Sequence, residues 1–335
     1  MRNQSRKKAR LAFLIAALLL IAGLAAGTWF WSTRNETRNF TLYYTDPQAM
    51  YLIPVSEARA LPRDDGKALS ALLNELTDAP VGLQATLPPG TVAEVQRISN
   101  GQANITLQVP TTMGSGAERL LAGAVAKTAA SLGSVREVRL QLRNRDGAPY
   151  ESQHLDLSAP LSPTDPGVEN LYLDGAGEGL MVTLYYTTAD GRYLVPLRRP
   201  LPPAYRTQPI EGSFQLLIAG PPSELTGILG PSVPVNPGIG WGGVAMGVAQ
   251  IDWPMDQPAP SAQALRAFAL TLTEFDGIRQ VSLKQQGREV ATSMRPAAIN
   301  VAGELPQGKL PQSASPTTRS LTPEASAAEA VYPAP

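Results

Sequence analysis

Few side chains in this sequence have the chemistry that catalysis or metal binding requires. His154 is the only histidine and the chain has no cysteine, which excludes thiolate zinc sites, cysteine nucleophiles, disulfide bonds and a lipid-modified cysteine. Histidine is the usual general base near neutral pH, but His154 stands among polar residues with no second histidine to complete a site. We therefore predict no catalytic, metal-binding or cofactor-binding residue, and expect a protein that is not an enzyme.

The acidic residues do not form a calcium-binding pattern. Asp64 and Asp65 are adjacent, but the further oxygen ligands that a calcium loop supplies at regular spacing are missing. Such a pair is typical of a helix start or a turn, where a carboxylate accepts from free backbone amides. Glu274 and Asp276 flank a predicted turn and receive the same interpretation.

Glycine and aromatic residues give two further candidates. The glycine-rich run 238–243 has no Lys-Ser or Lys-Thr after it, so it is interpreted as a flexible loop that displays Trp241 and not as a phosphate loop. Trp241 is a candidate interface residue, whereas Trp253 fits either an interface or a core. Five aromatic residues could stack on a glycan, although neighbouring tyrosines on a strand point to opposite faces: Tyr43, Tyr44, Tyr185, Tyr186 and Trp241.

A membrane anchor is predicted at the start of the chain. The basic segment 1–10 carries five cations, and the uncharged run 11–31 is long enough to cross a bilayer. The cations place the N-terminus in the cytoplasm, with Trp29, Phe30 and Trp31 at the outer interface. We expect a single-pass protein of the cytoplasmic membrane with its bulk outside. A cleaved signal peptide is the alternative, because Ala25, Ala26 and Gly27 suit a peptidase.

Charge argues against nucleic acid as a partner. The formal net charge is zero, but without the five N-terminal cations 23 basic residues face 28 acidic ones, a net charge of −5. A surface of this sign does not attract phosphates.

The elements that must position these residues occur twice. Leu42-Tyr43-Tyr44-Thr45 recurs as Leu184-Tyr185-Tyr186-Thr187, and Tyr51-Leu52-Ile53-Pro54-Val55 recurs as Tyr193-Leu194-Val195-Pro196-Leu197, both at an offset of 142. The segment 135–140 matches the segment 278–283 at an offset of 143. Ordered matches at a nearly constant offset indicate two copies of one domain.

Each copy alternates between strand and helix periods. In copy one, we predict a hairpin from the strands 40–45 and 51–55, with a turn at Asp46-Pro47. Helices are predicted at 67–76 and 117–132, and further strands at 103–109 and 135–140. In copy two, Pro209 near a helix start and Ser261 as an N-cap mark the two helices. We predict an α+β fold in which each domain has a sheet of three or four strands with two helices packed on one face.

The predicted domains are 39–146 and 180–290. Residues 147–179 form an ordered linker that could include a short strand, because leucines alternate with its polar residues. Residues 300–335 are rich in Pro, Ser, Thr and Ala, and we expect them to be disordered.

Both copies resemble the GerM-type domain (GerMN), a family named after a sporulation and germination protein of endospore-forming bacteria. Copy one carries Leu42-Tyr43-Tyr44, Leu87-Pro88-Pro89-Gly90-Thr91 and Asn100-Gly101-Gln102-Ala103; copy two carries Leu184-Tyr185-Tyr186 and Phe275-Asp276-Gly277-Ile278. The resemblance implies a compact α+β domain similar to ring-building domains of secretion-type complexes, displayed outside the membrane, with no known catalytic residues. The chain departs from the namesake type by lacking a lipoprotein cysteine, and in copy two residues 234–243 replace the Pro-Pro-Gly-Thr and Asn-Gly segments.

These observations favour a membrane-anchored, non-enzymatic interaction or scaffold protein of the bacterial envelope, in sporulation or germination, that binds envelope proteins or itself. The first alternative is a cell-wall binding protein that takes peptidoglycan. The second is an envelope-remodelling enzyme, for which the sequence offers no pair of nucleophile and base.

Overall fold

The computed structural model describes residues 35–110, 113–152, 154–173, 179–235 and 238–302. The predicted cytoplasmic segment and anchor, residues 1–31, and residues 303–335 of the predicted tail lie outside these ranges. Within the described ranges, no helix combines the length and the hydrophobicity that crossing a membrane requires.

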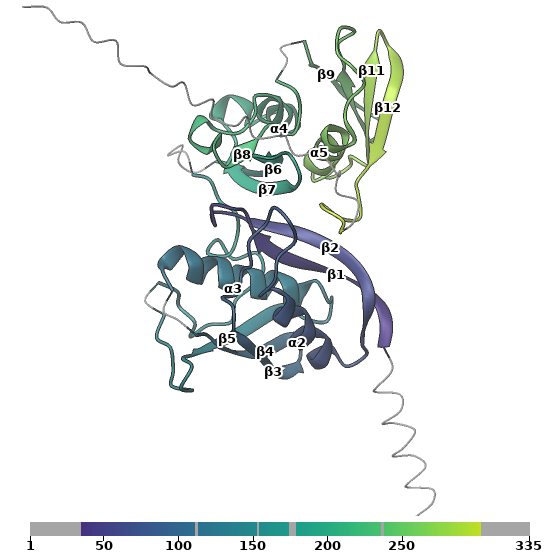
Figure 1. The fold of residues 1–335 in the computed structure, drawn as a ribbon. Coiled ribbons are helices and arrows are strands. Elements are labelled where there is room, and N and C mark those ends of the chain that lie inside the picture. Colours follow the sequence, from purple (N-terminus) through teal and green to yellow (C-terminus); the bar gives the residue numbers. More distant parts are fainter. Residues whose placement is uncertain (1–34, 111–112, 153, 174–178, 236–237, 303–335) are drawn as a thin grey trace, which may run out of the picture. The chain divides into compact units, whose positions relative to one another are not determined.

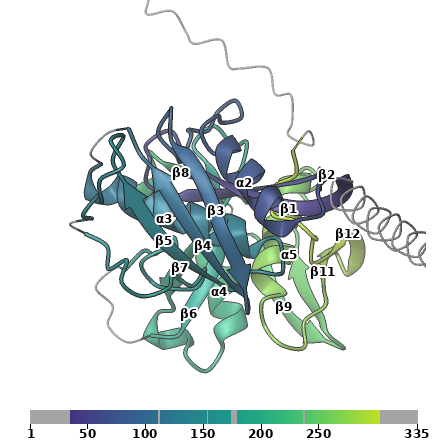
Figure 2. The same ribbon diagram turned by 90° about the horizontal axis from the view of Figure 1, so that it is seen from below.

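Copy one, called repeat 1 from here on, opens with the predicted hairpin (Figure 1). Its elements are β1 (Asn35–Thr45), β2 (Leu52–Pro62), α2 (Asp65–Glu75), β3 (Val92–Ser99), β4 (Gln102–Gln108), α3 (Ser115–Ala130) and β5 (Glu137–Arg143). β1 and β2 pair antiparallel with Thr45 opposite Leu52, so the hairpin is confirmed and is longer than predicted. The other strands form a sheet in the order β3-β4-β5, whose strands lie side by side in Figure 2.

Copy two, called repeat 2, has the same order of strands and helices and contains additional strands. Its elements are β6 (Met181–Thr188), β7 (Leu194–Pro200), α4 (Pro209–Ile218), β8 (Leu229–Gly230), β9 (Gly240–Ala245), β10 (Val248–Asp252), α5 (Ala262–Leu272), β11 (Gln280–Gln285) and β12 (Arg288–Met294). One sheet has the order β7-β6-β8 and the other β12-β11-β10-β9. β10 and β11 are parallel, as are β4 and β5, and the second helix of each repeat connects them.

The predicted mixed α+β class is confirmed, but the single sheet with helices on one face is wrong. Each repeat has two sheets, and its helices contact both of them: α3 packs on β1 and β5, and α5 packs on β6 and β12. The sequence of α3 gives the reason. Its side chains are buried nearly all round, including Leu121, Ala122, Val125 and Ala126, as expected for a helix between two layers.

The predicted helix starts are confirmed in atomic detail. The Asp64 carboxylate accepts from the Lys67 amide at 2.8 Å, and the Ser261 hydroxyl accepts from the Ala264 amide at 3.0 Å. Pro209 is the first residue of α4, where its missing N–H has no helical partner to lose.

The segments between and after the repeats differ from expectation. In its described part, the linker 147–179 contains only isolated bridges, such as Leu161 with Val138, and no strand. The predicted disordered tail includes Asn300, which is 4% exposed and whose side chain makes three hydrogen bonds, so the ordered part extends at least to Ala302. The glycine run 238–243 is not a loop but leads into β9, the edge of its sheet.

Candidate functional site

The segment that follows each repeat pairs with the hairpin of the other repeat. We call these segments arm 1 (Asn170–Tyr172, after repeat 1) and arm 2 (Asn300–Ala302, after repeat 2). In arm 2, the Ser56 amide donates to the Asn300 carbonyl at 2.8 Å and the Ala302 amide donates to the Ser56 carbonyl at 2.9 Å. Arm 2 therefore forms a parallel β-bridge on the outer edge of β2.

Arm 1 does the same on β7. The Arg198 amide donates to the Asn170 carbonyl at 2.8 Å, and the Tyr172 amide donates to the Arg198 carbonyl at 2.9 Å. Ser56 and Arg198 are equivalent positions, separated by the repeat offset of 142. Each repeat therefore pairs with the arm that follows the other repeat, and the two arms contact equivalent positions.

The asparagine side chains tie each arm to both repeats. The Leu52 amide donates to Asn170 Oδ1 at 2.7 Å, while Asn170 Nδ2 donates to the carbonyls of Leu52 at 2.7 Å and Pro196 at 2.9 Å. Asn300 repeats this pattern on the equivalent residues. The Leu194 amide donates to its Oδ1 at 2.8 Å, and its Nδ2 donates to the carbonyls of Leu194 at 2.8 Å and Pro54 at 2.7 Å.

These asparagines were not found from the sequence. The repeat was recognised from segments at an offset of 142 or 143, whereas the two asparagines are 130 apart and follow connections of different length. In the sequence, each asparagine stands directly before an apolar residue and follows the last predicted strand of its copy. This two-residue pattern is too short to be recognised.

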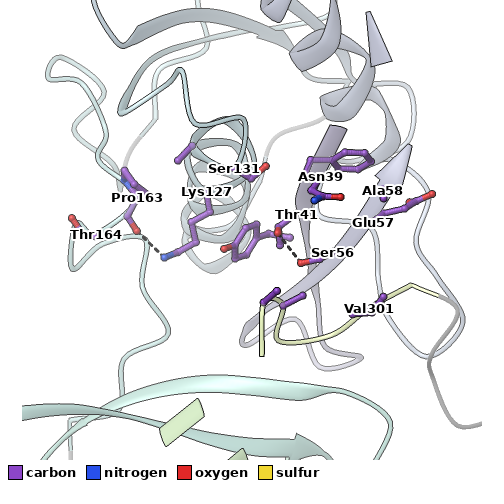
Figure 3. Close-up of a pocket in the computed structure, with 15 residues that line it drawn as sticks. Asn39, Thr41, Ser56, Glu57, Ala58, Lys127, Ser131, Pro163, Thr164 and Val301 are labelled. Carbon is purple, nitrogen blue, oxygen red and sulfur yellow. Dashed lines mark hydrogen bonds between the residues drawn. The ribbon is translucent and has the colours of Figure 1, made fainter. Parts of the chain in front are cut away.

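A cavity of about 630 Å³ lies beside the point where arm 2 meets β2 (Figure 3). Its apolar lining includes Phe40, Tyr43 and Val301, and the hydroxyls of Thr41 and Ser56 are 2.8 Å apart on its wall. The remaining lining residues come from both strands, α3, the linker and the segment before arm 2: Asn39, Glu57, Ala58, Lys127, Ala130, Ser131, Pro163, Thr164, Ala297 and Ala298. Its size is that of a site for a small ligand or for a few side chains of a peptide.

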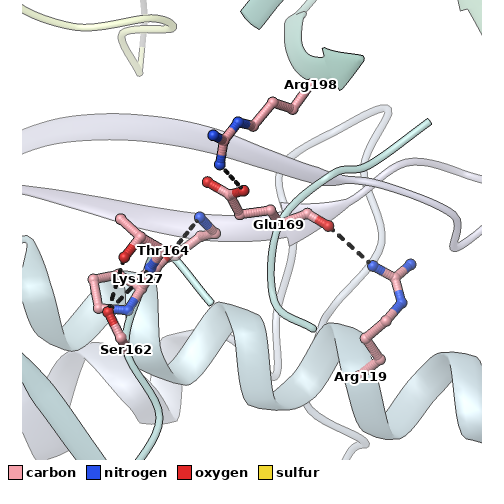
Figure 4. A network of polar contacts seen from close by, with 7 residues as sticks. Arg119, Lys127, Ser162, Thr164, Glu169 and Arg198 are labelled. Atoms are coloured by element: carbon pink, nitrogen blue, oxygen red, sulfur yellow. Dashed lines mark hydrogen bonds and ion pairs between the residues drawn. The ribbon is translucent and has the colours of Figure 1, made fainter. Parts of the chain in front are cut away.

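Lys127 is the cation of this cavity, and the linker holds it. Its Nζ donates to the Pro163 carbonyl at 2.7 Å and lies 6.0 Å from the centre of the Tyr43 ring (Figure 3). Burial lowers its pKa; Glu169 opposes that shift and Arg198 adds to it. Glu169 in turn pairs with Arg198 at 2.5 Å, and its carbonyl accepts from Arg119 at 3.3 Å (Figure 4).

Lys127 is the one group near the cavity with a lowered pKa among the described residues, and its ammonium already donates to a carbonyl oxygen. In the same described ranges, no group of three or more His, Asp or Glu side chains is placed to hold a metal ion. His154 is exposed and lies in the linker, outside the lining of the cavity.

The tyrosines proposed as stacking surfaces are mostly in the core. Tyr44, Tyr185 and Tyr186 are at most 5% exposed, so that part of the stacking hypothesis is wrong. Adjacent tyrosines point to opposite faces, as predicted, but the helices and the other elements cover both faces. Only Tyr43 is half-buried, and it lines the cavity.

The remaining candidates have structural roles. Trp253 is buried and its Nε1 donates to the Pro258 carbonyl at 3.0 Å. Trp241 packs against Phe214, with ring centres 5.3 Å apart. Glu274 accepts from the Tyr185 hydroxyl at 2.8 Å.

Asp65 belongs to an ion pair at the start of α2. It accepts from Arg38 at 2.6 Å. Burial raises its pKa, but hydrogen bonds from Ser134 and Arg38 outweigh burial and leave the pKa below its ordinary value.

Comparison with known proteins agrees with this architecture. The tandem GerMN domains of the sporulation protein GerM from Bacillus subtilis superpose with a TM-score of 0.53 at 20% identity, covering 79% of this chain and 99% of that one. The first GerMN domain of the same protein gives 0.27 at 21% identity, over 38% and 100% of the two chains. A putative lipoprotein from Clostridium perfringens gives 0.25 at 18% identity, over 38% and 87%. No curated protein sequence matches significantly.

The sequence profile of the Germane family, described as sporulation and spore germination, matches residues 41–151 and 183–291. These two matches cover about two thirds of the chain and fall on the two repeats. The chain therefore belongs to the Germane family and carries two tandem copies of its domain.

Proposed function

We propose that this protein is a membrane-anchored, extracytoplasmic interaction module of the bacterial envelope, without catalytic activity, that acts in sporulation or germination. The family match supports the process. The basic segment and the apolar run at the N-terminus support the anchor. Envelope proteins, or further copies of this chain, are the proposed partners.

The exchange of arms between the repeats is the observation that carries the proposal. Two small domains joined by a flexible linker would move independently, whereas two buried asparagines and two parallel β-bridges hold these domains together. The polar groups at this junction are used to fix structure and not to perform chemistry. A body of this kind is suited to presenting fixed surfaces to partners.

The proposal is tested by capture of the tagged full chain from membranes in mild detergent, followed by mass spectrometry and light scattering. We expect a stoichiometric complex with an envelope protein, or a defined oligomer. The test variant is the chain with Asn170→Ala and Asn300→Ala, which removes the side-chain hydrogen bonds between the repeats and should lose the complex. Asn144→Ala, at an exposed asparagine, is the matched control. A monomer without protein partners would contradict the scaffold role.

The orientation in the membrane is tested separately. A reporter that is active only outside the cytoplasm, fused after residue 302, should be active, and the same reporter at the N-terminus should be inactive. Protease added to intact protoplasts should digest the repeats. An active N-terminal fusion would contradict the orientation.

Binding to peptidoglycan is the second candidate, because the half-buried Tyr43 ring and the hydroxyl pair of Thr41 and Ser56 share one cavity. Purified sacculi should then sediment the protein, and Tyr43→Ala should reduce the bound fraction several-fold. Tyr205→Ala, at another half-buried tyrosine that lies outside the cavity lining, is the control. Equal sedimentation of both variants would remove the cavity from consideration.

A further inference from the structure

Arm 2 covers only part of the outer edge of β2. Hydrogen-bonding direction alternates along a strand, and the backbone of Ser56 faces arm 2, so the amides of Ala58 and Ala60 face the same way. Both alanines are exposed. Among the described residues, neither amide has a hydrogen-bond partner on this side. Within the part of the chain that the structure describes, this edge therefore carries no added strand beyond arm 2.

Prolines show that the remainder of this edge is closed to added strands. Pro54 and Pro62 occupy the same outward-facing series as Ala58 and Ala60, and proline has no N–H to donate to a neighbouring strand. The open stretch is therefore limited at both ends, by arm 2 on one side and by Pro62 on the other.

Repeat 2 provides an internal comparison. Its position equivalent to Ala58 is Pro200, at the repeat offset of 142. Arm 1 pairs with Arg198, and β7 then ends at that proline, so no donor follows the arm. The two repeats share the arm but differ at the next outward position. Only repeat 1 keeps a backbone donor there.

The cavity lies directly beside the open edge. Ser56, Ala58 and Val301 all line it, and Figure 3 shows them around the same space. Side chains on an added strand alternate between its two faces, and Val301 of arm 2 already faces the cavity. A strand continuing past Ala302 would direct a further side chain toward Phe40, Tyr43 and Ala130, an environment that favours an apolar group.

We propose that an extended peptide segment of a partner protein adds to β2 at Ala58 and Ala60 and places an apolar side chain in this cavity. The inference rests on the proposed interaction role and specifies the surface that performs it. Backbone hydrogen bonds to the strand supply affinity in this mode of recognition, and the pocket for alternate side chains supplies specificity.

The test uses the full chain in detergent and a display library of random eight-residue peptides as the probe. Peptides selected on the wild type should bind Ala58→Pro at least ten-fold more weakly, because proline removes the outward donor without breaking a bond to β1. Ala259→Pro, the same substitution at an exposed loop residue, should bind them as the wild type does. Circular dichroism should show equal folding of all three proteins.

A second measurement applies if Ala58→Pro does not fold. Bound peptide should slow hydrogen exchange at the amides of Ala58 and Ala60 in the wild type. Failure to select any peptide, equal binding to Ala58→Pro, or unchanged exchange would overturn the inference. Binding seen only after truncation behind Ala302 would also overturn it, because the chain itself would then cover the edge. If Ala58→Pro still captures the envelope partner, the interaction role stands and this surface is excluded.

Discussion

Replacing Asn300 by alanine should destabilise both repeats, although the residue lies ten positions beyond the end of the second predicted domain, 180–290. Its side chain makes three hydrogen bonds to backbone groups, two to Leu194 in repeat 2 and one to Pro54 in repeat 1. All of these groups are buried, and Asn300 itself is 4% exposed. Alanine would leave one amide and two carbonyls without a partner.

The magnitude follows from the groups left unpaired. A buried hydrogen bond contributes about 1 kcal/mol net, and a buried donor left without a partner costs about 1–3 kcal/mol. Three bonds therefore give a loss of roughly 3 kcal/mol in the free energy of unfolding, which lowers the melting temperature by roughly 5–10 °C for a unit of this size. Asn170→Ala should cost the same within about 1 kcal/mol, since its three bonds are equivalent.

Urea unfolding followed by tryptophan fluorescence and circular dichroism measures this effect. Asn144→Ala is the control, because Asn144 is exposed and its described contacts are made by its backbone. Asn300→Asp should be worse than Asn300→Ala at pH 7, since a carboxylate would face the carbonyls of Leu194 and Pro54. The reasoning is refuted if Asn300→Ala loses no more stability than Asn144→Ala, or if Asn300→Asp matches the wild type.

Three further predictions concern the elements that support this junction. Gly123→Ala should destabilise by about 1–3 kcal/mol although alanine favours helices, because its Cβ would lie 2.8 Å from Leu52; Gly116→Ala in the same helix meets nothing and should be neutral or stabilising in the same melts. Asp64→Ala should cost about 1 kcal/mol through loss of the N-cap of α2, measured by urea unfolding; a change below about 0.3 kcal/mol would contradict that role. Burial raises the pKa of Tyr43 to about 12, so the unfolded chain ionises from pH 10 while the folded chain stays neutral. Stability should therefore fall between pH 10 and 12, and less steeply in Tyr43→Phe.

The local structure was predictable because its signals are local. The turn at Asp46 is one example: its carboxylate accepts from the amides of Gln48, Met50 and Tyr51, a pattern that an Asp-Pro pair after an apolar strand indicates. The helix caps at Asp64 and Ser261 are others. Each depends on residues within a few positions of one another.

The layering and the junction were not predictable in the same way. The periodicity of α3 identified one apolar face, but alanines and Gly123 on its other face also pack, and small residues give little hydrophobic signal. Asn300 contacts Pro54, a residue 246 positions away, through a side chain that is commonly found at surfaces. A polar residue that satisfies buried backbone groups cannot be told from a loop residue until the fold brings its partners to it.

The exchange of arms also orders the events of synthesis. A chain emerges from the ribosome with its N-terminus first, so β1, β2 and the rest of repeat 1 can fold long before residue 300 exists. During that interval the edge of β2 at Pro54 and Ser56 lacks arm 2, the partner that it has in the finished protein. Contacts between residues so distant in sequence form slowly, and an uncovered strand edge invites pairing with other chains. Arm 2 can therefore dock only after residues 300–302 have been synthesised, and a chaperone or a binding partner that covers this edge earlier would have to leave before the contacts of Asn300 with Pro54 can form.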